Sequence, residues 1–365
     1  MSYNTEKQYL IALNHFPKFG EKRLKLLKNY FSSWENAYKA KINQYIEAKI
    51  PENVANEFIA FRNNLDISQV ISVLEKENIK IIELEKEDYP SLLSEIYDPP
   101  RLLFCKGDTS ILKNKCIGIV GSRKCTPYGM QATSKLVKEL CGNDFSIVSG
   151  LAMGIDAHAH KNCNDIGGKT IAVLGTGIDS ASIYPSQNRY LAKEILDKDG
   201  LIISEFSVGT PPLRHHFPMR NRIISGLSLG IIVIEAVEKS GAIITAQTAI
   251  DQNRDVFAVP GSIFSDSSKG TNKLIKQGAR LVENSQDILD ALDINQLSSY
   301  ISIEKLEAKS PDEEKIIPHL SHDPIHIDEL KRLSGLDSAS LSSAITMMEL
   351  RGAIKDFGGK KYAIK

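Results

Sequence analysis

The sequence is poor in the residues that mark secreted, metal-binding or membrane proteins. Its 365 residues include only five cysteines, which form neither a C-x-x-C pair nor a His/Cys cluster at zinc spacing, so we predict reduced thiols and no metal site. No run approaches the roughly 18 apolar residues that span a bilayer. The polar start "MSYNTEKQYL" lacks a signal-peptide pattern, which predicts a cytoplasmic protein without a membrane partner. The formal net charge is zero, so any anion site has to be local.

The composition is otherwise that of a globular protein, with 42% hydrophobic and 25% charged residues, and the length predicts more than one domain. Residues 1–80 predict short helices. A turn at Gly20 within "LNHFPKFGEKRLKLLKNYF" suits either a helix-hairpin-helix (SAM-like) module that sets amides against DNA phosphate or a plain turn in a helical bundle. Residues 81–109 are interrupted by prolines and predict a connector with an edge strand.

The C-terminal segment has a different pattern. After a linker at 293–304, residues 305–365 predict three helices followed by two short strands around Gly358 and Gly359, which is typical of a winged helix. The third helix, within "SASLSSAITMMELRG", is poor in Arg and Lys. Contact with another protein therefore suits this helix at least as well as contact with DNA.

Between these flanks, residues 110–292 alternate apolar runs with amphipathic segments. Runs such as "CIGIV", "FSIVSG", "KTIAVLG" and "LGIIVIEA" are rich in β-branched residues and apolar on both faces, and most spacers have room for a crossover helix. We therefore predict a Rossmann-like, doubly wound α/β fold with a mostly parallel sheet. Ligands of such sheets bind beyond the carboxyl ends of the strands. Those ends carry Gly121, Gly150, Gly175, Gly177 and Gly261.

The first glycine loop departs from the dinucleotide-binding fingerprint. A G-x-G-x-x-G register at this strand end would need glycines where Val120 and Arg123 stand, so no nucleotide cofactor is predicted. Gly121, Ser122 and Arg123 remain, followed by Thr126 as a helix N-cap; free amides beside a guanidinium would form a phosphate site. A structural turn with a solvated or salt-bridged arginine is the alternative.

The other strand ends add glycines, a hydroxyl and one arginine. In "VSGLAMGIDAHAH", His158 and His160 cannot share one helix face, which argues against a metal site. The segments "VLGTGIDSASIYPSQNR" and "EAVEKSGAIITAQTA" give a third and a fourth glycine-containing strand exit. The further candidate positions in these loops are Gly150, Gly154, Arg189, Ser240 and Gly241.

The most informative stretch is "PPLRHHFPMRNRIISGLS" at residues 211–228. Cations interleaved with an aromatic ring suit a single strand of nucleic acid, because arginine meets phosphate and the ring stacks a base. The alternative is a loop with Phe217 in the core and exposed arginines. Glu205 and Glu235, at strand ends, also leave hydrolysis of a nucleotide bond open. The candidates in this stretch are Arg214, Phe217, Arg220, Asn221 and Arg222.

Six segments that occur in order carry a resemblance to a known family. They are "GIVGSRKCTPYG", "IVSGLAMGIDAHAH", "AVLGTGIDSASIYP", "SEFSVGTPPLRHHFPMRNRIISGLS", "VIEAVEKSGAIITAQTAIDQNRDVFAVPGSI" and "KGTNKLIKQGARLV". Together they closely resemble DNA-processing protein A (DprA, also called Smf) across residues 90–292. The resemblance implies a cytoplasmic homodimer that binds single-stranded DNA without sequence preference, protects incoming DNA and loads the RecA recombinase during natural transformation.

The resemblance also implies roles for particular residues. It assigns the DNA pocket to Arg123 of the G-S-R loop and to the candidates of the stretch 211–228. Relatives often carry basic residues just after the Tyr-Pro, where this chain has Ser186 and Gln187, so Arg189 would have to supply the charge on that side. The implied partner surface comprises Gln247, Ile250 and Asp255.

Two other readings compete with this one. Related phosphoribohydrolases that resemble lysine decarboxylases use a P-G-G-x-G-T-x-x-E loop, but the corresponding "EKSGAIITAQTA" lacks the glycine pair and the glutamate. A scaffold for a RecA-type partner without DNA contact would leave the Arg/Phe cluster unexplained. We therefore expect a DNA-binding protein rather than an enzyme, with no cofactor.

Overall fold

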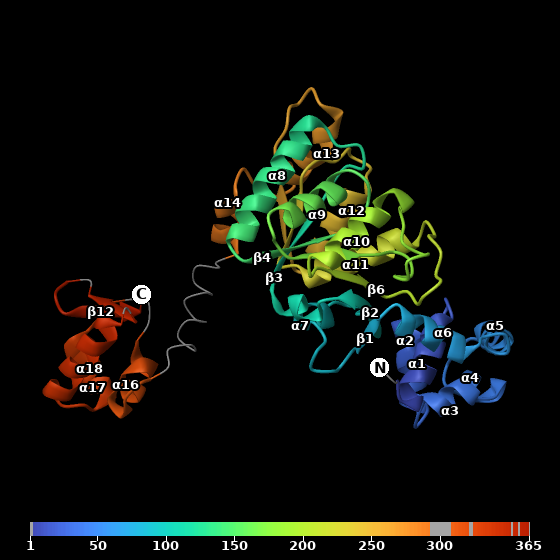
Figure 1. The fold of residues 1–365 in the computed structure, drawn as a ribbon, viewed down its shortest axis with the longest axis horizontal. Helices are drawn as coiled ribbons and strands as arrows, with labels where there is room; N and C mark the ends of the chain where they lie inside the picture. The colour runs from blue at the N-terminus through green and yellow to red at the C-terminus, as the bar shows by residue number, and fades with distance from the viewer. Residues whose placement is uncertain (1–2, 293–307, 321–323, 352, 357, 365) are drawn as a thin grey trace. The chain divides into compact units, whose positions relative to one another are not determined.

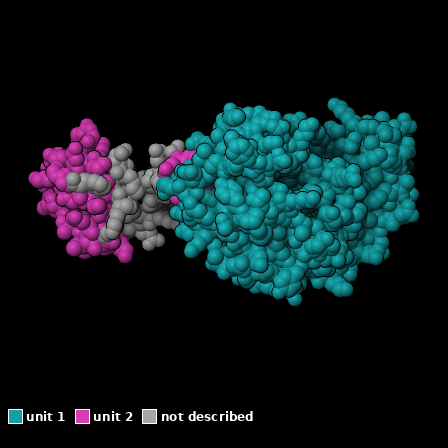
Figure 2. Space-filling view, turned by 90° about the horizontal axis from the view of Figure 1, so that it is seen from above, with its two compact units in different colours: residues 1–287 teal, residues 288–365 magenta. Residues whose placement is uncertain are grey.

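The computed structural model describes residues 3–292, 308–320, 324–351, 353–356 and 358–364. It divides into two compact units, Met1–Asp287 and Ile288–Lys365 (Figures 1 and 2). The predicted linker at 293–304 lies outside the described residues. Among the helices of the described ranges, none is both long and apolar enough to cross a membrane.

Six helices open the first unit and pack around an aromatic core. The rings of Phe16, Phe19 and Phe58 lie 4.7 to 5.4 Å apart between centroids. Arg101 is 2% exposed, and its guanidinium pairs with Glu21 at 2.6 Å. This pair joins the predicted module 1–80 to the same unit as the sheet. The helices are α1 (Thr5–His15), α2 (Glu21–Tyr30), α3 (Trp34–Lys39), α4 (Ile42–Glu47), α5 (Glu52–Arg62) and α6 (Ile67–Lys76).

A nine-stranded sheet forms the centre of this unit, in the order β1-β2-β6-β5-β4-β3-β7-β8-β9. The seven strands from β6 to β9 are parallel, whereas β1 and β2, from the connector, pair antiparallel at one edge. The predicted mostly parallel α/β fold is confirmed. The strands are β1 (Lys80–Glu83), β2 (Leu102–Gly107), β3 (Lys115–Val120), β4 (Phe145–Ser149), β5 (Thr170–Val173), β6 (Leu201–Ser204), β7 (Gly230–Val233), β8 (Asp255–Ala258) and β9 (Arg280–Leu281).

Helices lie on both faces of the sheet (Figure 1). Alternate residues of its strands are therefore buried on opposite sides. In β5, Ile171 and Val173 belong to one hydrophobic core, together with apolar residues of α11 and α12. Ala172, between them, belongs to a second core, together with apolar residues of α10. This burial explains the runs that are apolar on both faces. The helices are α7 (Ser91–Ser94), α8 (Pro127–Gly142), α9 (Ile155–Asp165), α10 (Arg189–Asp197), α11 (His216–Leu227), α12 (Gly241–Asp251), α13 (Lys269–Lys276) and α14 (Ser285–Ala291).

The second unit has the predicted winged-helix fold. Three helices pack through Ile316, Leu330 and Met348 against a small antiparallel sheet of order β10-β12-β11. Asp337 caps the third helix, since its carboxylate accepts from the amides of Ala339 and Ser340. The elements are α16 (Pro311–Ile316), β10 (Ile325–His326), α17 (Ile327–Ser334), α18 (Ser338–Leu350), β11 (Ile354–Asp356) and β12 (Lys361–Ile364).

Candidate nucleic-acid interface

A cleft of about 920 Å³ opens beyond the carboxyl ends of β3 and β7. These strands are neighbours, and the sheet grows away from them in opposite directions, through β4 to β6 on one side and through β8 on the other. Such a switch in strand order is where doubly wound sheets bind ligands. The cleft is walled by the loop Gly121–Lys124, one face of α11 and the segment from Val237 to Thr245.

A layer of one cation and two aromatic rings lines this cleft. The Arg123 guanidinium lies over the Phe217 ring, 5.9 Å from its centroid, and the Tyr184 ring lies 5.7 Å from that of Phe217. Arg123 and Tyr184 are exposed and Phe217 is half-buried. Phe217 therefore packs against the protein on one side while its ring borders the open cleft. Arg214 and Lys124, also exposed, add positive charge to the same lining.

The helical period of α11 decides which of its polar residues reach the cleft. Phe217, Arg220, Asn221 and Ile224 all line it, and their spacing of three and four residues places them on one helix face. Pro218, in the first turn of the helix, lines the cleft as well. Arg222 falls on another face and lies outside the lining. Its Nη2 donates to Glu205 at 2.6 Å and its Nε to Asp98 at 3.0 Å. The structure thus places Arg222 outside the cleft lining, and its predicted contact with DNA stays a prediction.

Arg220 is a buried cation at the base of the cleft, with 4% exposure. Its Nη1 donates to the Val173 carbonyl at 2.9 Å, while its Nε has no hydrogen-bond partner in the described ranges. Burial lowers the pKa of Arg220 to about 10 despite the nearby Asp156 carboxylate. A Cβ on Gly150 would come within 1.5 Å of Nη1, so glycine there makes room for the guanidinium.

Two glycine loops pack directly on each other beneath the cleft. The amide of Ile155 donates to the Ser122 carbonyl at 3.1 Å. Gly154 has φ +81°, and a Cβ on it would come within 2.2 Å of the Ser122 oxygen, so both conformation and space require glycine. The buried Asp156 carboxylate accepts from the amides of Gly150 and Ala152 at 3.1 and 3.4 Å. Burial raises the pKa of Asp156.

The start of α8 is already occupied by a protein carboxylate. Glu235, 1% exposed, accepts from the Thr126 amide at 2.9 Å, from the Thr126 hydroxyl at 2.5 Å and from the Ser267 hydroxyl at 3.1 Å. The Thr126 hydroxyl in turn accepts from the Gly129 amide. The expected free amides at this helix start are thus partly used, and an anion in the cleft would depend on side-chain cations.

The remaining predicted positions divide between the cleft and its surroundings. Ser240 and Gly241 line the cleft at the start of α12, and the Ser240 hydroxyl has no hydrogen-bond partner among the residues that the structure describes. Arg189 lies outside the lining. Its guanidinium donates to the carbonyls of Ala181 and Ile183 at 2.7 and 3.3 Å, so it supports the loop that carries Tyr184.

Two family models match this chain, one over the domain that forms the cleft and one over the winged helix. The model described as "DNA recombination-mediator protein A" matches residues 80–293, and that described as "DprA winged helix domain" matches residues 304–360. The chain belongs to the DprA family. Its match to Protein Smf of Synechocystis sp. has 34% identity and covers 98% of this chain and 99% of that protein.

Further DprA relatives and solved structures cover the sheet domain. The DNA processing protein DprA of Bacillus subtilis is 45% identical over 62% of this chain and 75% of its own length. DprA from Streptococcus pneumoniae superposes with a TM-score of 0.66 at 37% identity, over 80% of this chain and 98% of its own. DprA from Helicobacter pylori, solved for its "single-stranded DNA binding mode", gives 0.53 at 33% identity over 60% and 98%.

The carboxylates that left hydrolysis open have structural partners in this DprA fold. Glu235 caps α8, and Glu205 pairs with Arg222 away from the cleft. His160 is fully buried with Nδ1 2.7 Å from the Thr170 hydroxyl, and burial lowers its pKa to about 3. Within the described ranges, no group of three His, Cys, Asp or Glu side chains could hold a metal ion.

Sequence reasoning missed some of the lining. Lys124 directly follows the predicted loop, so its charge could have been included on adjacency alone. Tyr184 lies in the segment that follows the third glycine-rich strand exit, and this position could have indicated that it lines the cleft. Asp266 and Ser267 come from the loop after β8 and line the cleft. The pairing of Ser267 with Glu235 could not be read from the sequence, since 32 positions separate them.

The predicted partner surface lies on and after α12. Gln247 is exposed and Ile250 is 53% exposed. The helix ends at Asp251, so Asp255 begins β8 rather than ending the helix. The Asp255 carboxylate lies 3.4 Å from Arg280 Nε, with both side chains partly exposed. None of these three residues lines the cleft.

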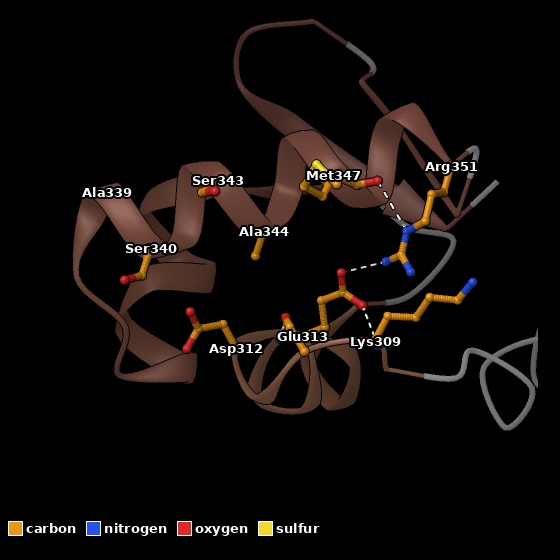
Figure 3. A pocket seen from close by; sticks show the side chains of 10 residues that line it. Lys309, Asp312, Glu313, Ala339, Ser340, Ser343, Ala344, Met347 and Arg351 are labelled. Atoms are coloured by element: carbon orange, nitrogen blue, oxygen red, sulfur yellow. Dashed lines mark hydrogen bonds and ion pairs between the residues drawn. The ribbon is translucent and has the colours of Figure 1, made fainter.

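A second hollow, of about 590 Å³, lies in the winged-helix unit between α16 and α18. Figure 3 shows small side chains of α18 facing α16, and the Arg351 guanidinium pairing with the buried Glu313 carboxylate at 2.5 Å. No Arg or Lys occurs in α18. The exposed lysines of this unit's hairpin are Lys355, Lys360 and Lys361.

Deletion of residues 305–365 is expected to leave binding of single-stranded oligonucleotides largely intact. The cleft and its cations lie wholly within unit 1, and α18 offers no side chain that neutralises phosphate. Fluorescence anisotropy on the full and shortened chains measures the difference. A loss of more than about tenfold, or about 1.4 kcal/mol, would show that the tail contributes contacts.

Proposed function

We propose that this member of the DprA family binds single-stranded DNA in the cleft without sequence preference and delivers it to the RecA recombinase. In this proposal the protein acts in the cytoplasm as a homodimer, protects incoming DNA during natural transformation and catalyses no reaction itself. The observation that carries the proposal is the layer of Arg123, Phe217 and Tyr184 beside two further exposed cations.

The chemistry of this layer fits a flexible single strand. Exposed guanidinium and ammonium groups neutralise phosphates, which carry no sequence information. The open side of the Phe217 ring offers a stacking surface to any base, because every base has a π-face. In a duplex the bases are already stacked on each other, so a ring on the wall of a cleft gains nothing from them. The single-stranded DNA binding mode described for the H. pylori relative supports the same ligand class.

Purified protein is expected to bind single strands at least tenfold more tightly than duplex of equal length, with little difference between homopolymers. Anisotropy titrations with labelled oligo-dT, oligo-dC and a mixed sequence, each beside a duplex, test this at one fixed salt concentration. Equal affinity for duplex and single strand would contradict the proposal. An assay for base release from nucleoside monophosphates in the same samples tests the enzyme alternative.

The recombinase part of the proposal concerns Gln247, Ile250 and Asp255. An exposed isoleucine between polar neighbours offers a mixed face that suits a protein partner, and the three residues lie outside the cleft lining. The half-exposed pair of Asp255 with Arg280 contributes at most about 1 kcal/mol, so the surface can be altered without loss of the fold.

Light scattering on the intact chain tests the homodimer.

Reversal of charge in Asp255→Lys is expected to abolish recombinase loading while oligonucleotide binding stays within about twofold, since the residue lies outside the cleft. Loading is measured as strand exchange by RecA on DNA coated with single-strand binding protein. Asp197→Lys, at the exposed last residue of α10, is the matched control. Loss of oligonucleotide binding in Asp255→Lys alone would argue against a separate partner surface.

A further inference from the structure

Two cysteines lie in contact at the end of the helix pair α8 and α9. Cys141 stands in the last turn of α8 and Cys163 in the last turn of α9, and their Sγ atoms are 3.6 Å apart. A Cβ placed on Gly168 would lie 2.7 and 2.8 Å from the two sulfurs. The loop after α9 therefore packs over the pair only because glycine stands there.

The two thiols differ in exposure and in acidity. Cys141 is partly exposed, whereas Cys163 has no exposed surface and its Sγ also lies 3.3 Å from the Lys169 carbonyl. The hydrogen bond from Cys163 lowers the pKa of Cys141, and the same bond with burial raises the pKa of Cys163. The accessible sulfur is thus the better nucleophile, and its neighbour holds the proton.

We propose that Cys141 and Cys163 are a modification site at which hydroperoxides form an intramolecular disulfide. The Cys141 thiolate attacks one peroxide oxygen, the O–O bond breaks, and sulfenic acid and hydroxide result. The Cys163 sulfur then attacks the sulfenic sulfur; the S–O bond breaks, and the Cys163 proton leaves with the hydroxyl as water. Two sulfurs lose two electrons in total, and the peroxide is reduced. A cellular dithiol reverses the bond by exchange.

The remaining thiols lack this combination. Cys105 and Cys116 are buried in the core, and burial raises the pKa of Cys116 to about 12 and that of Cys105 as well. Cys125 is partly exposed in the loop before α8, but burial raises its pKa too. In the part of the chain that the structure describes, none of the three makes a hydrogen bond to a second sulfur, so the reaction is expected at one pair.

The disulfide would complete a tie between two helices that hold the cleft. At the other end, the amide of Ile155, the first residue of α9, already donates to the carbonyl of Ser122 in the loop that leads into α8. Cys141 and Cys163 would join the opposite ends. A helix of 16 residues is about 24 Å long, so oxidation would change no residue that lines the cleft.

The test treats the full chain with hydrogen peroxide at a small molar excess and maps its peptides without reduction. We expect a linked peptide pair containing Cys141 and Cys163, three free thiols out of five in denaturant, a melting temperature raised by several degrees and reversal of all three by dithiothreitol. Oligonucleotide affinity should stay within about twofold.

Single variants identify the order of the steps. Cys163→Ser should trap sulfenic acid on Cys141, seen as a dimedone adduct, whereas Cys141→Ser should give neither adduct nor linked pair. Cys125→Ser is the matched control and should link as the unaltered chain does. Unlinked peptides after peroxide, with Cys141 unmodified or taken to sulfinic acid, would overturn the proposal. A disulfide from Cys141 to Cys125, formed as readily as the one to Cys163, would also overturn it. Both of these contrary results would be seen with the unaltered chain, so the test does not depend on a variant that folds.

Discussion

Replacement of Arg222 by alanine is expected to lower the free energy of unfolding of unit 1 by about 3 to 5 kcal/mol. The Arg222 side chain is 12% exposed and pairs with Glu205, which is 13% exposed, and with Asp98. Removal of the guanidinium leaves the Glu205 carboxylate buried without its counter-charge, which costs more than the pair itself contributes. Urea unfolding followed by the fluorescence of Trp34, the single tryptophan, measures the change.

The pH dependence of this loss has a definite sign. Burial already raises the pKa of Glu205 although Arg222 opposes the shift, and without Arg222 it would rise further. A carboxyl group with a higher pKa in the folded state stabilises the fold below its unfolded pKa, and that contribution is lost as the pH rises through the folded pKa. The deficit of Arg222→Ala should therefore be smaller at pH 5 than at pH 8.

Two further variants separate a structural role from DNA contact. Arg222→Met combined with Glu205→Leu removes both charges and should recover most of the lost stability, since replacing a buried pair with apolar residues is often neutral. Arg214→Ala, in the exposed cleft lining, should weaken oligonucleotide binding without lowering stability. If Arg222→Ala unfolded like the unaltered chain yet lost binding, Arg222 would contact DNA after all.

Arg222 also shows where sequence reasoning reaches its limit. The composition of residues 211–228 predicts a cluster of cations around one ring, and the structure places Arg214, Arg220 and Phe217 of this stretch in the cleft lining. The structure begins α11 at His216, inside this stretch, and the residue composition does not locate that start. Once Phe217 and Arg220 share a helix, the period of 3.6 residues sends Arg222 to a different face. The side on which a polar residue lies thus depended on a helix boundary that propensity alone does not fix.

The strands of the sheet could be predicted from the sequence, whereas the partners of the loop residues could not. Strands buried on both faces need long apolar runs, and "CIGIV" and "LGIIVIEA" became the adjacent strands β3 and β7. The partners of loop residues are set by tertiary contacts instead. Glu235 caps Thr126 across 109 positions, so the sequence suggested free amides where a carboxylate stands. The Arg189 guanidinium donates to carbonyls of its own loop. These partners depend on the backbone conformation of the loop, which the sequence alone does not give.

Loss of the Phe217 ring is expected to weaken binding of single strands by about 1 to 3 kcal/mol, the contribution of one base stacked on an aromatic side chain. Stacking involves no counterion, so Phe217→Ala should leave the slope of log affinity against log salt nearly unchanged. Thermal melts are needed first, because the half-buried ring also packs beside Tyr184. Phe217→Leu, which keeps apolar volume but no ring, is the control for packing, and it should bind as weakly as the alanine variant.

Arg123→Ala should differ from Phe217→Ala in slope even where the affinities match. Removal of one phosphate contact on a single strand flattens the salt plot by about 0.7, because one fewer counterion is released. The guanidinium also lies over the Phe217 ring, so the double variant should lose less affinity than the sum of the single losses. Lys193→Ala removes an exposed cation of α10 that does not line the cleft, and it should leave affinity and slope unchanged. An Arg123→Ala protein that is folded, with both quantities unaltered, would make the Gly121-Ser122-Arg123 loop a structural turn and move the phosphate contacts to Arg214 and Lys124.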